Sequence, residues 1–505
     1  MNSISPAPPA FLPAAQVRAV MTGLMIVVLL GAMDQTIVSV ALPQMSGDLQ
    51  GFSLLAWVVS GYLIATAVSM PIYGKLGDLY GRRNTLSYAI VIFLLASAAC
   101  AMASSMEMLV GSRILQGIGG GGLISVAQAV VADVVSPRER GRYQGYFSTT
   151  YAVASVAGPL VGGLLTHYLS WRWVFWINLP LALAALVIAR RTLSMLPVPK
   201  IHRRIDFGGA VLLTSALSAL LVAITRAGQG MAWLSAENSL LFGASLVLLL
   251  AFVWQETRFP EPLIPLRLFK MRTVVICCVV AFIGFIQIVS LSVLIPLQME
   301  TLAGAGPREA AYGLIPFTLA TPIGAYVAGK FAAYSARFKP LILVGNALAF
   351  AGLLGFAFSG VHAVFLNALL LAVVGFGIGM QLPSTMVGVQ NAVLRQDTGV
   401  ATATIAFVRS FGAAIGVAVL TAILLSGLRG NAPGLAASMS GAEILRGLIE
   451  GNLAAADPTL RQHLTLGASA AFRQIFLVSA FLGLVALGAG ALLRNEKLHD
   501  KPKLE

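Results

Sequence analysis

Residues 19–42 read AVMTGLMIVVLLGAMDQTIVSVAL, and Asp34 is the one charged residue in this run. The hydrocarbon core of a bilayer is about 30 Å thick, so about 20 apolar residues cross it as a helix. A carboxylate near the centre of such a helix costs ~2.5 to 3.5 kcal/mol on insertion scales, and chains that carry one usually use it to bind or relay ions and protons. The stretch therefore predicts a membrane helix whose carboxylate moves an ion or a proton.

The whole chain has the composition of a polytopic membrane protein. Of its 505 residues, 58% are hydrophobic and only 10% are charged, which is too few to cover a soluble globular surface. Basic loops on one side of a membrane explain the net charge of +14, so we expect no nucleic-acid partner. The three Cys and five His residues show no disulfide or metal-site spacing. We expect no metal, no cofactor and, because no nucleophile, base and acid group together, no enzyme.

Fourteen stretches of about twenty uncharged residues predict an all-α fold with 14 transmembrane helices. They lie near residues 19–42, 53–73, 86–104, 107–132, 143–166, 173–189, 207–225, 239–255, 274–299, 310–329, 340–358, 362–383, 400–426 and 474–493. Lys and Arg fall mainly on alternate loops, which the positive-inside rule assigns to the cytoplasm. Because fourteen is even, both termini are expected to be cytoplasmic.

A weak internal repeat indicates a transporter built from two related halves. The matching pairs, at offsets of 253 to 258 residues, are Pro43 and Pro296, Gly74 and Gly329, Gly117 and Gly375, and Gly158 and Gly416. We therefore predict two six-helix pseudo-repeat bundles plus an inserted helix pair. The predicted parts are a cytoplasmic tail (1–18), a six-helix bundle (19–190), the inserted pair with its linkers (191–257), a second six-helix bundle (258–494) that includes an outer loop (427–472), and a cytoplasmic tail (495–505).

The outer loop carries signs of local helices. Ile444, Leu445, Leu448 and Ile449 form an amphipathic stripe, and Asp457 before Pro458 is typical of a helix start. We expect short helices that lie against the outer face. An irregular loop that only bridges the gap is the alternative.

The sequence GKLGDLYGRR at residues 74–83 resembles the signature between spans two and three of the major facilitator superfamily. Glycines there permit a tight turn and close helix approach, while an acid and arginines can pair across neighbouring helix ends. The resemblance implies a conformational latch, and a plain positive-inside turn is the alternative. The latch residues are Gly74, Asp78, Gly81, Arg82 and Arg83.

Three further stretches are similar to the fourteen-span drug:proton antiporter branch of that family. Residues 33–43 resemble its first-span signature, residues 113–117 its buried-arginine motif, and residues 145–162 its antiporter motif, with Ala154 where the family usually has glycine. The antiporter-motif positions are Gly145, Gly158, Pro159 and Gly162. In exporters this motif is held to bias opening and block leak, and generic packing of small residues is the alternative.

What the resemblance implies is proton-coupled multidrug efflux in a bacterial cytoplasmic (inner) membrane. The expected partners are a small lipophilic substrate, protons and membrane lipids. A periplasmic adaptor is left open. An exporter of an endogenous metabolite or lipid, or a receptor or assembly component that no longer transports, are the alternative functions.

Asp34 and Arg113 are the candidate proton-coupling residues. At 1.5 Å rise per residue, Asp34 lies ~12 Å and Arg113 ~9 Å from the outer ends of their spans, so the two side chains can reach each other. Burial disfavours the charged form of Asp34, whereas Arg113 or an arriving cation favours it. Proton and substrate would then compete for one carboxylate. A fixed structural ion pair is the alternative.

The second half lacks a matching acid, because Gln287 stands where the repeat places Asp34 and no acid lies deep in the later spans. One carboxylate suggests one proton per cycle, so we expect neutral or monocationic lipophilic substrates. Arg409, ~15 Å into its span, is expected either to contact an anionic group or to hold helices together.

Overall fold

The computed structural model describes residues 14–50, 54–136, 139–195, 206–228, 231–260, 262–394, 397–430, 439, 441–450 and 458–495. These residues form helices and short connections, and no strand occurs among them. Most of the two predicted tails and Asp457, the predicted helix start, lie outside the described residues.

Seventeen α-helices follow one another along the described parts of the chain. The first seven are α1 (Ala14–Leu49), α2 (Leu55–Tyr80), α3 (Arg82–Ala101), α4 (Met106–Val134), α5 (Arg140–Tyr168), α6 (Trp173–Trp176) and α7 (Asn178–Thr192). Two follow as a hairpin, α8 (Phe207–Gly228) and α9 (Ala236–Arg258). The rest are α10 (Arg272–Ala303), α11 (Pro307–Gly313), α12 (Ile315–Ser335), α13 (Lys339–Phe358), α14 (Val364–Ala392), α15 (Thr398–Gly430), α16 (Gly441–Glu450) and α17 (Pro458–Ala491).

The described residues contain twelve candidate spans, helices long and apolar enough to cross a membrane, with α6 and α7 counted together. Helices α5 and α12, which occupy the other two predicted spans, are not among the twelve. Both carry many Gly, Ser, Thr and Tyr residues, which lower their apolar character. The prediction of a polytopic helical protein is confirmed, whereas the number fourteen stays a prediction.

Proline divides two stretches that were predicted as single spans. The predicted span 173–189 is broken between α6 and α7, where Pro180 can neither donate a hydrogen bond to the carbonyl of Trp176 nor fit its ring against that group. The predicted span 310–329 is likewise split into α11 and α12 just before Pro316. The first of these breaks has a functional consequence, because Asn178 stands at it.

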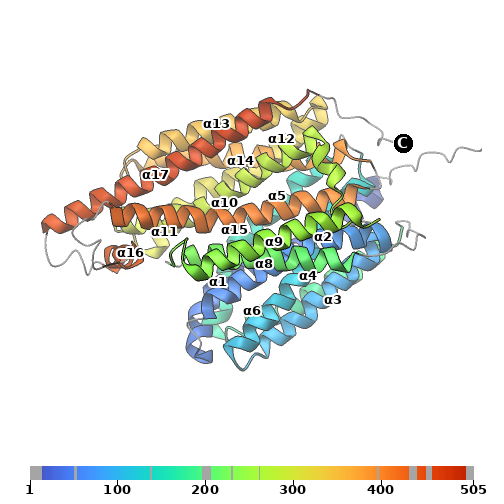
Figure 1. Cartoon of the computed structure of the whole chain (residues 1–505), viewed down its shortest axis with the longest axis horizontal. Helices are drawn as coiled ribbons and strands as arrows, with labels where there is room; N and C mark the ends of the chain where they lie inside the picture. Colours follow the sequence, from blue (N-terminus) through green and yellow to red (C-terminus); the bar gives the residue numbers. More distant parts are fainter. Residues whose placement is uncertain are drawn as a thin grey trace, which may run out of the picture.

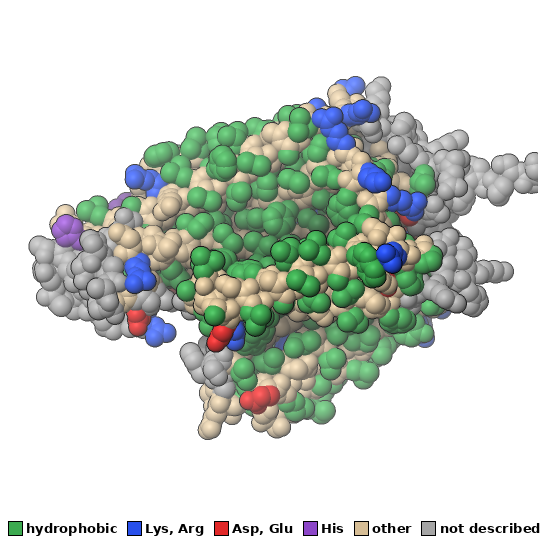
Figure 2. Space-filling view, in the orientation of Figure 1, with side chains coloured by type: hydrophobic (Ala, Val, Ile, Leu, Met, Phe, Trp, Pro, Cys, Tyr) green, Lys and Arg blue, Asp and Glu red, His purple; other side chains and the backbone are tan. Residues whose placement is uncertain are grey.

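The long helices run side by side along the length of the molecule (Figure 1). Of the four largest hydrophobic cores among the described residues, helices α1–α7 supply two and α10–α17 the other two. Helix α1 begins and α17 ends at the same end of the bundle (Figure 1). Lys and Arg side chains gather mostly at that end, and hydrophobic side chains cover much of the length between the two ends (Figure 2). We call this end the basic end.

Two elements lie outside the main bundle. The α8–α9 hairpin crosses the front of the molecule (Figure 1), and α8 packs against both α2 and α15. Helix α16 carries the predicted stripe, with Ile444 fully buried, and packs against α10 and α15. A short helix in the predicted loop 427–472 is thus confirmed, whereas its position on the outer face stays a prediction. Helix α17 begins at Pro458, well before the predicted span at 474–493.

Candidate functional site

Asp34 lies inside the group of helices α1–α7 and is fully buried, with 0% of its surface exposed. Its Oδ2 accepts a hydrogen bond from Arg113 Nη1 at 2.7 Å. Its Oδ1 accepts from Gln116 Nε2 at 2.9 Å and from Asn178 Nδ2 at 2.7 Å. Three donors from α4 and α7 therefore surround one carboxylate of α1, which is the arrangement that a buried charge needs.

Arg113 is equally well held. Besides Asp34, its Nη1 donates to Gln116 Oε1 at 2.6 Å, and its Nε donates to the carbonyl oxygen of Val58 at 3.2 Å. The guanidinium carbon lies 4.1 Å from the ring centroid of Tyr62, close enough for a cation–π contact. The structure thus brings together the two residues that helix depth suggested could meet.

Sequence reasoning missed the other members of this network. Ser97 Oγ accepts from both Gln116 Nε2 and Asn178 Nδ2 at 3.1 Å and donates to the carbonyl oxygen of Phe175 at 3.0 Å. Gln116 could have been found, because a residue three positions after Arg113 shares its helix face. Asn178 gave a weaker signal, an amide two residues before a helix-breaking proline.

The burial of the network defines what the carboxylate can do in this conformation. Asp34 has no exposed surface, and the side chains of Arg113, Gln116 and Asn178 donate hydrogen bonds to its two carboxylate oxygens. Direct competition between proton and substrate for Asp34, as the sequence suggested, therefore needs a different conformation. Protonation of Asp34 would weaken the hydrogen bonds from Arg113, Gln116 and Asn178 together.

The predicted latch residues lie at the basic end, where the two groups of helices, α1–α7 and α10–α17, meet. Asp78 Oδ1 pairs with Arg82 Nη2 at 2.6 Å, and Asp78 Oδ2 accepts a hydrogen bond from the backbone N–H of Val400 at 2.9 Å. Val400 lies in the first turn of α15, where backbone N–H groups lack helical partners and the helix dipole favours an anion. Arg82 Nε also donates to Asp133 Oδ2 at 2.8 Å. Asp78 thus joins α2 to α15.

Two glycines of the latch have clear steric roles. Gly74 lies against Gly399 and Ala403 of α15, where an added Cβ would come within 3.1 Å of the Gly399 carbonyl oxygen. Gly81 separates α2 from α3 with φ of 84°, a backbone conformation that favours glycine. Arg83, the remaining latch residue, is half-buried at the start of α3.

Replacing Asp78 by asparagine is expected to loosen the basic end. The hydrogen bond from the Val400 N–H to the Asp78 carboxylate is charge-assisted and contributes ~1.5 to 3 kcal/mol, so loss of that charge should shift the equilibrium away from this conformation by up to about tenfold. Spin labels at the exposed positions Tyr80 and Phe331 should then report a larger population of long distances. Glu139→Gln, which changes an exposed carboxylate at the same end, is the control. An unchanged distance distribution in Asp78→Asn would contradict the latch.

Helix α5 contacts both groups of helices through its small residues. Gly145 lies against α12, where an added Cβ would come within 3.2 Å of the Ala325 carbonyl oxygen. Further along α5, a Cβ on Gly162 would lie 2.8 Å from the carbonyl oxygen of Ile37 in α1, and one on Gly158 would overlap Thr36. Pro159 lies within α5 and is exposed.

The departure at Ala154 leaves this packing intact. Ala154 is fully buried, and its carbonyl oxygen accepts a hydrogen bond from Thr36 Oγ1 at 3.0 Å. Thr36 is two residues from Asp34, so α5 touches α1 beside the buried carboxylate. Polar contacts between the two groups include the hydrogen bond from Arg140 Nη1 to the Gln390 carbonyl oxygen at 3.3 Å.

The two candidate residues of the second half do not lie together. Gln287 is fully buried, and its Nε2 donates to the carbonyl oxygen of Ser479 in α17 at 2.8 Å. Arg409 lies in α15 and binds α14, where its Nη2 donates to the carbonyl oxygen of Leu382 and to Thr385 Oγ1 at 3.1 Å. The position that mirrors Asp34 therefore makes a neutral contact between helices.

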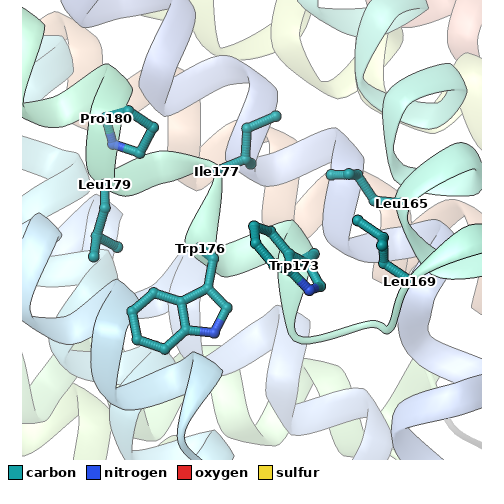
Figure 3. A pocket seen from close by; sticks show the side chains of 7 residues that line it. All are labelled: Leu165, Leu169, Trp173, Trp176, Ile177, Leu179 and Pro180. Carbon is teal, nitrogen blue, oxygen red and sulfur yellow. The ribbon is translucent and has the colours of Figure 1, made fainter.

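An apolar pocket of about 540 Å³ lies on the side of α5, α6 and α7 (Figure 3). It is lined by Leu165, Leu169, Trp173, Trp176, Ile177, Leu179 and Pro180. The pocket lies at the break that Pro180 causes, and its wall residue Ile177 directly precedes Asn178. Across the described part of the chain, no three His, Cys, Asp or Glu side chains are grouped so that they could hold a metal ion.

Comparisons with known proteins agree with this architecture. A family model described as Major Facilitator Superfamily matches residues 24–417. An MFS-type transporter of Mycobacterium tuberculosis is 36% identical over 410 residues, which are 81% of this chain and 59% of that protein. This chain therefore spans about three fifths of that relative's length. Multidrug resistance protein 3 of Bacillus subtilis is 34% identical over 408 residues, or 80% of this chain and 79% of that one.

Among solved structures, the proton:xylose symporter XylE bound to 6-bromo-6-deoxy-D-glucose superimposes with a TM-score of 0.62. The sequence identity is 14%, and the match covers 97% of this chain and 98% of that one. At so low an identity, the likeness concerns the fold alone.

Proposed function

The chain belongs to the Major Facilitator Superfamily, a family of membrane transporters rather than enzymes, and we propose that it is a proton-coupled antiporter that exports lipophilic drug-like compounds. The buried Asp34–Arg113 pair is the observation that carries this proposal. The names of the Bacillus relatives, Multidrug resistance protein 3 and Multidrug transporter protein MdtP, support the substrate class.

Proton coupling follows from the balance of charges around Asp34. An ionised Asp34 neutralises Arg113, whereas a protonated Asp34 leaves a buried cation and makes the present packing of α1, α4 and α7 unfavourable. Proton binding thus biases the choice between two packings of these helices. Because Thr36 joins α1 to α5, a shift of α1 is passed to the helix that touches α12.

Alternating access requires that one end closes while the other opens. Here the basic end is closed by the hydrogen bond between Asp78 of α2 and the first turn of α15. The close contacts of Gly74 in α2 and Gly145 in α5 with the other group of helices close it as well. We propose that this end is cytoplasmic, by the positive-inside rule, and that both termini lie on that side of a bacterial cytoplasmic membrane. The conformation is then closed to the cytoplasm.

We also propose that α5 and α12 cross the membrane with the twelve candidate spans, which makes fourteen. Both are long, and they pack against each other, and small and polar residues are tolerated at such contacts between membrane helices. On this view residues 19–190 and 258–494 are the two halves and 191–257 the inserted pair. The proposed partners are protons, membrane lipids and a small lipophilic substrate. The proposal includes transport with or without a periplasmic adaptor.

The charge of the substrate gives a direct test in reconstituted vesicles. Exchange of one proton for a monocation moves no net charge, whereas export of a dication against one proton opposes an inside-negative potential by ~2.3 kcal/mol per 100 mV. A monocationic dye should therefore be exported in response to a pH gradient at a rate that a clamped potential leaves unchanged. Its dicationic analogue should be exported much more slowly, and preferred export of the dication would contradict one-proton exchange.

A further inference from the structure

Arg409 is a buried cation that no carboxylate neutralises within the described residues. Its side chain is 7% exposed, its two hydrogen bonds both come from Nη2, and its Nε has no partner. The guanidinium lies 5.5 Å from the ring centroid of Phe285, which offers only a weak cation–π contact. Arg113, by contrast, has Asp34 and a second acceptor on its Nη1.

A second unsatisfied group lies one helical turn away. Gln381 is 1% exposed, and neither its Oε1 nor its Nε2 has a hydrogen-bond partner. It precedes Thr385, which accepts from Arg409, by four residues and so shares a face of α14 with it. Its amide lies against Gly284, where an added Cβ would be 3.1 Å from Gln381 Oε1, and Gly284 is next to Phe285. The guanidinium and the amide thus face the same short piece of α10.

The position of this cluster suits a substrate. Arg409 is ~16 Å from the start of α15, which places it near the middle of a membrane helix. The next residue, Ser410, contacts Met70 Sδ of α2 at 3.6 Å, so the cluster lies where the two groups of helices meet. The latch contacts of Gly399 and Ala403 lie closer to the basic end.

We propose that Arg409 and Gln381 form a subsite for the carboxylate group of a lipophilic substrate. Burial of a guanidinium without a counter-charge, together with an amide without a hydrogen-bond partner, is unfavourable for the protein by itself, and apolar residues of similar size would hold the helices as well. A carboxylate accepts from the Nε–H of arginine and from the amide N–H of glutamine, and so gives an acceptor to the unpartnered donors of both side chains.

This inference rests on the proposed export function and adds carboxylate-bearing compounds to its substrate class. Neutral substrates that fit would be zwitterions with a carboxylate, and lipophilic monoanions are admitted as well. Export of a monoanion in exchange for an entering proton is favoured by an inside-negative potential in both directions of movement. The subsite therefore agrees with one-proton exchange.

Binding to the purified protein in detergent, at one pH and without a gradient, tests the subsite. The probes are a hydrophobic aryl carboxylate and its methyl ester, which differ only in the charged group. We expect the acid to bind the protein about tenfold more tightly than the ester. Arg409→Gln should remove this preference. Gln381→Glu, which places a carboxylate beside Arg409, should remove it too and raise the Tm.

The exposed Arg226, which pairs with Glu237 at the end of α8, supplies the matched control, and Arg226→Gln should keep the preference for the acid. Equal binding of acid and ester to the unmodified protein would overturn the subsite, as would a preference that survives in a folded Gln381→Glu variant. Because the assay contains no proton gradient, failure of the subsite is distinct from failure of proton coupling at Asp34.

Discussion

Proton-driven efflux is expected to be lost when Asp34 is replaced by asparagine. In vesicles with an imposed pH gradient, the rate should fall at least about tenfold, to the level seen without a gradient, because asparagine cannot titrate. The substitution also leaves Arg113 without its counter-charge in a buried site, which costs ~3 to 5 kcal/mol. Loss of transport by Asp34→Asn could therefore arise from unfolding as well as from lost coupling.

A double variant separates the two causes. Asp34→Asn combined with Arg113→Gln removes both charges, so its Tm should recover while proton-driven efflux stays absent. Glu237→Gln, which changes a carboxylate that is 70% exposed, should transport normally. Full acceleration by the pH gradient in the folded double variant would show that the pair is only structural.

Gly158→Leu is expected to stop transport by forcing α5 away from α1. A Cβ at this position overlaps Thr36 and lies 3.3 Å from the backbone nitrogen of Ile37, so neither helix can accommodate it by a side-chain movement. Overpacking of this kind costs ~1 to 3 kcal/mol and displaces backbone. Because Thr36 is two residues from Asp34, the strain falls on the carboxylate network, and transport should fall at least about tenfold.

The same helix supplies the control. A Cβ on Gly163 meets only Val40 Cγ1, at 3.9 Å, which is ordinary contact. Gly163→Leu should therefore keep most of the transport rate of the unmodified protein. Similar rates for Gly158→Leu and Gly163→Leu would show that the close packing of α5 on α1 has no role in the cycle.

The strongest signals in the sequence were those that depend on one helix at a time. The carboxylate in an apolar run identified Asp34, and depth along two helices suggested that Arg113 could reach it. The residues that complete the network come from other helices, and nothing in a single sequence specifies which faces of α3 and α7 turn inward. Ser97 and Asn178 were therefore not found.

Helix ends were harder to predict than helices. A hydropathy reading finds the apolar centre of a span, but α1 and α17 continue through polar residues beyond it. The break at Ile177 depends on a proline three residues later, a local rule that the reading of apolar runs ignored. This break matters because it places the Asn178 amide on Asp34 Oδ1.

The inserted hairpin has a mechanical consequence. Leu213 and Leu217 of α8 pack with Val68 of α2 and Phe407 of α15 in one hydrophobic cluster, so α8 touches both groups of helices. If the two groups rotate against each other, α8 cannot keep both contacts unchanged and must slide along at least one of them. This is a shear movement, in which packed helices shift by small steps while their side chains stay in contact. The hairpin therefore provides an apolar sliding contact between the two groups of helices during the transport cycle.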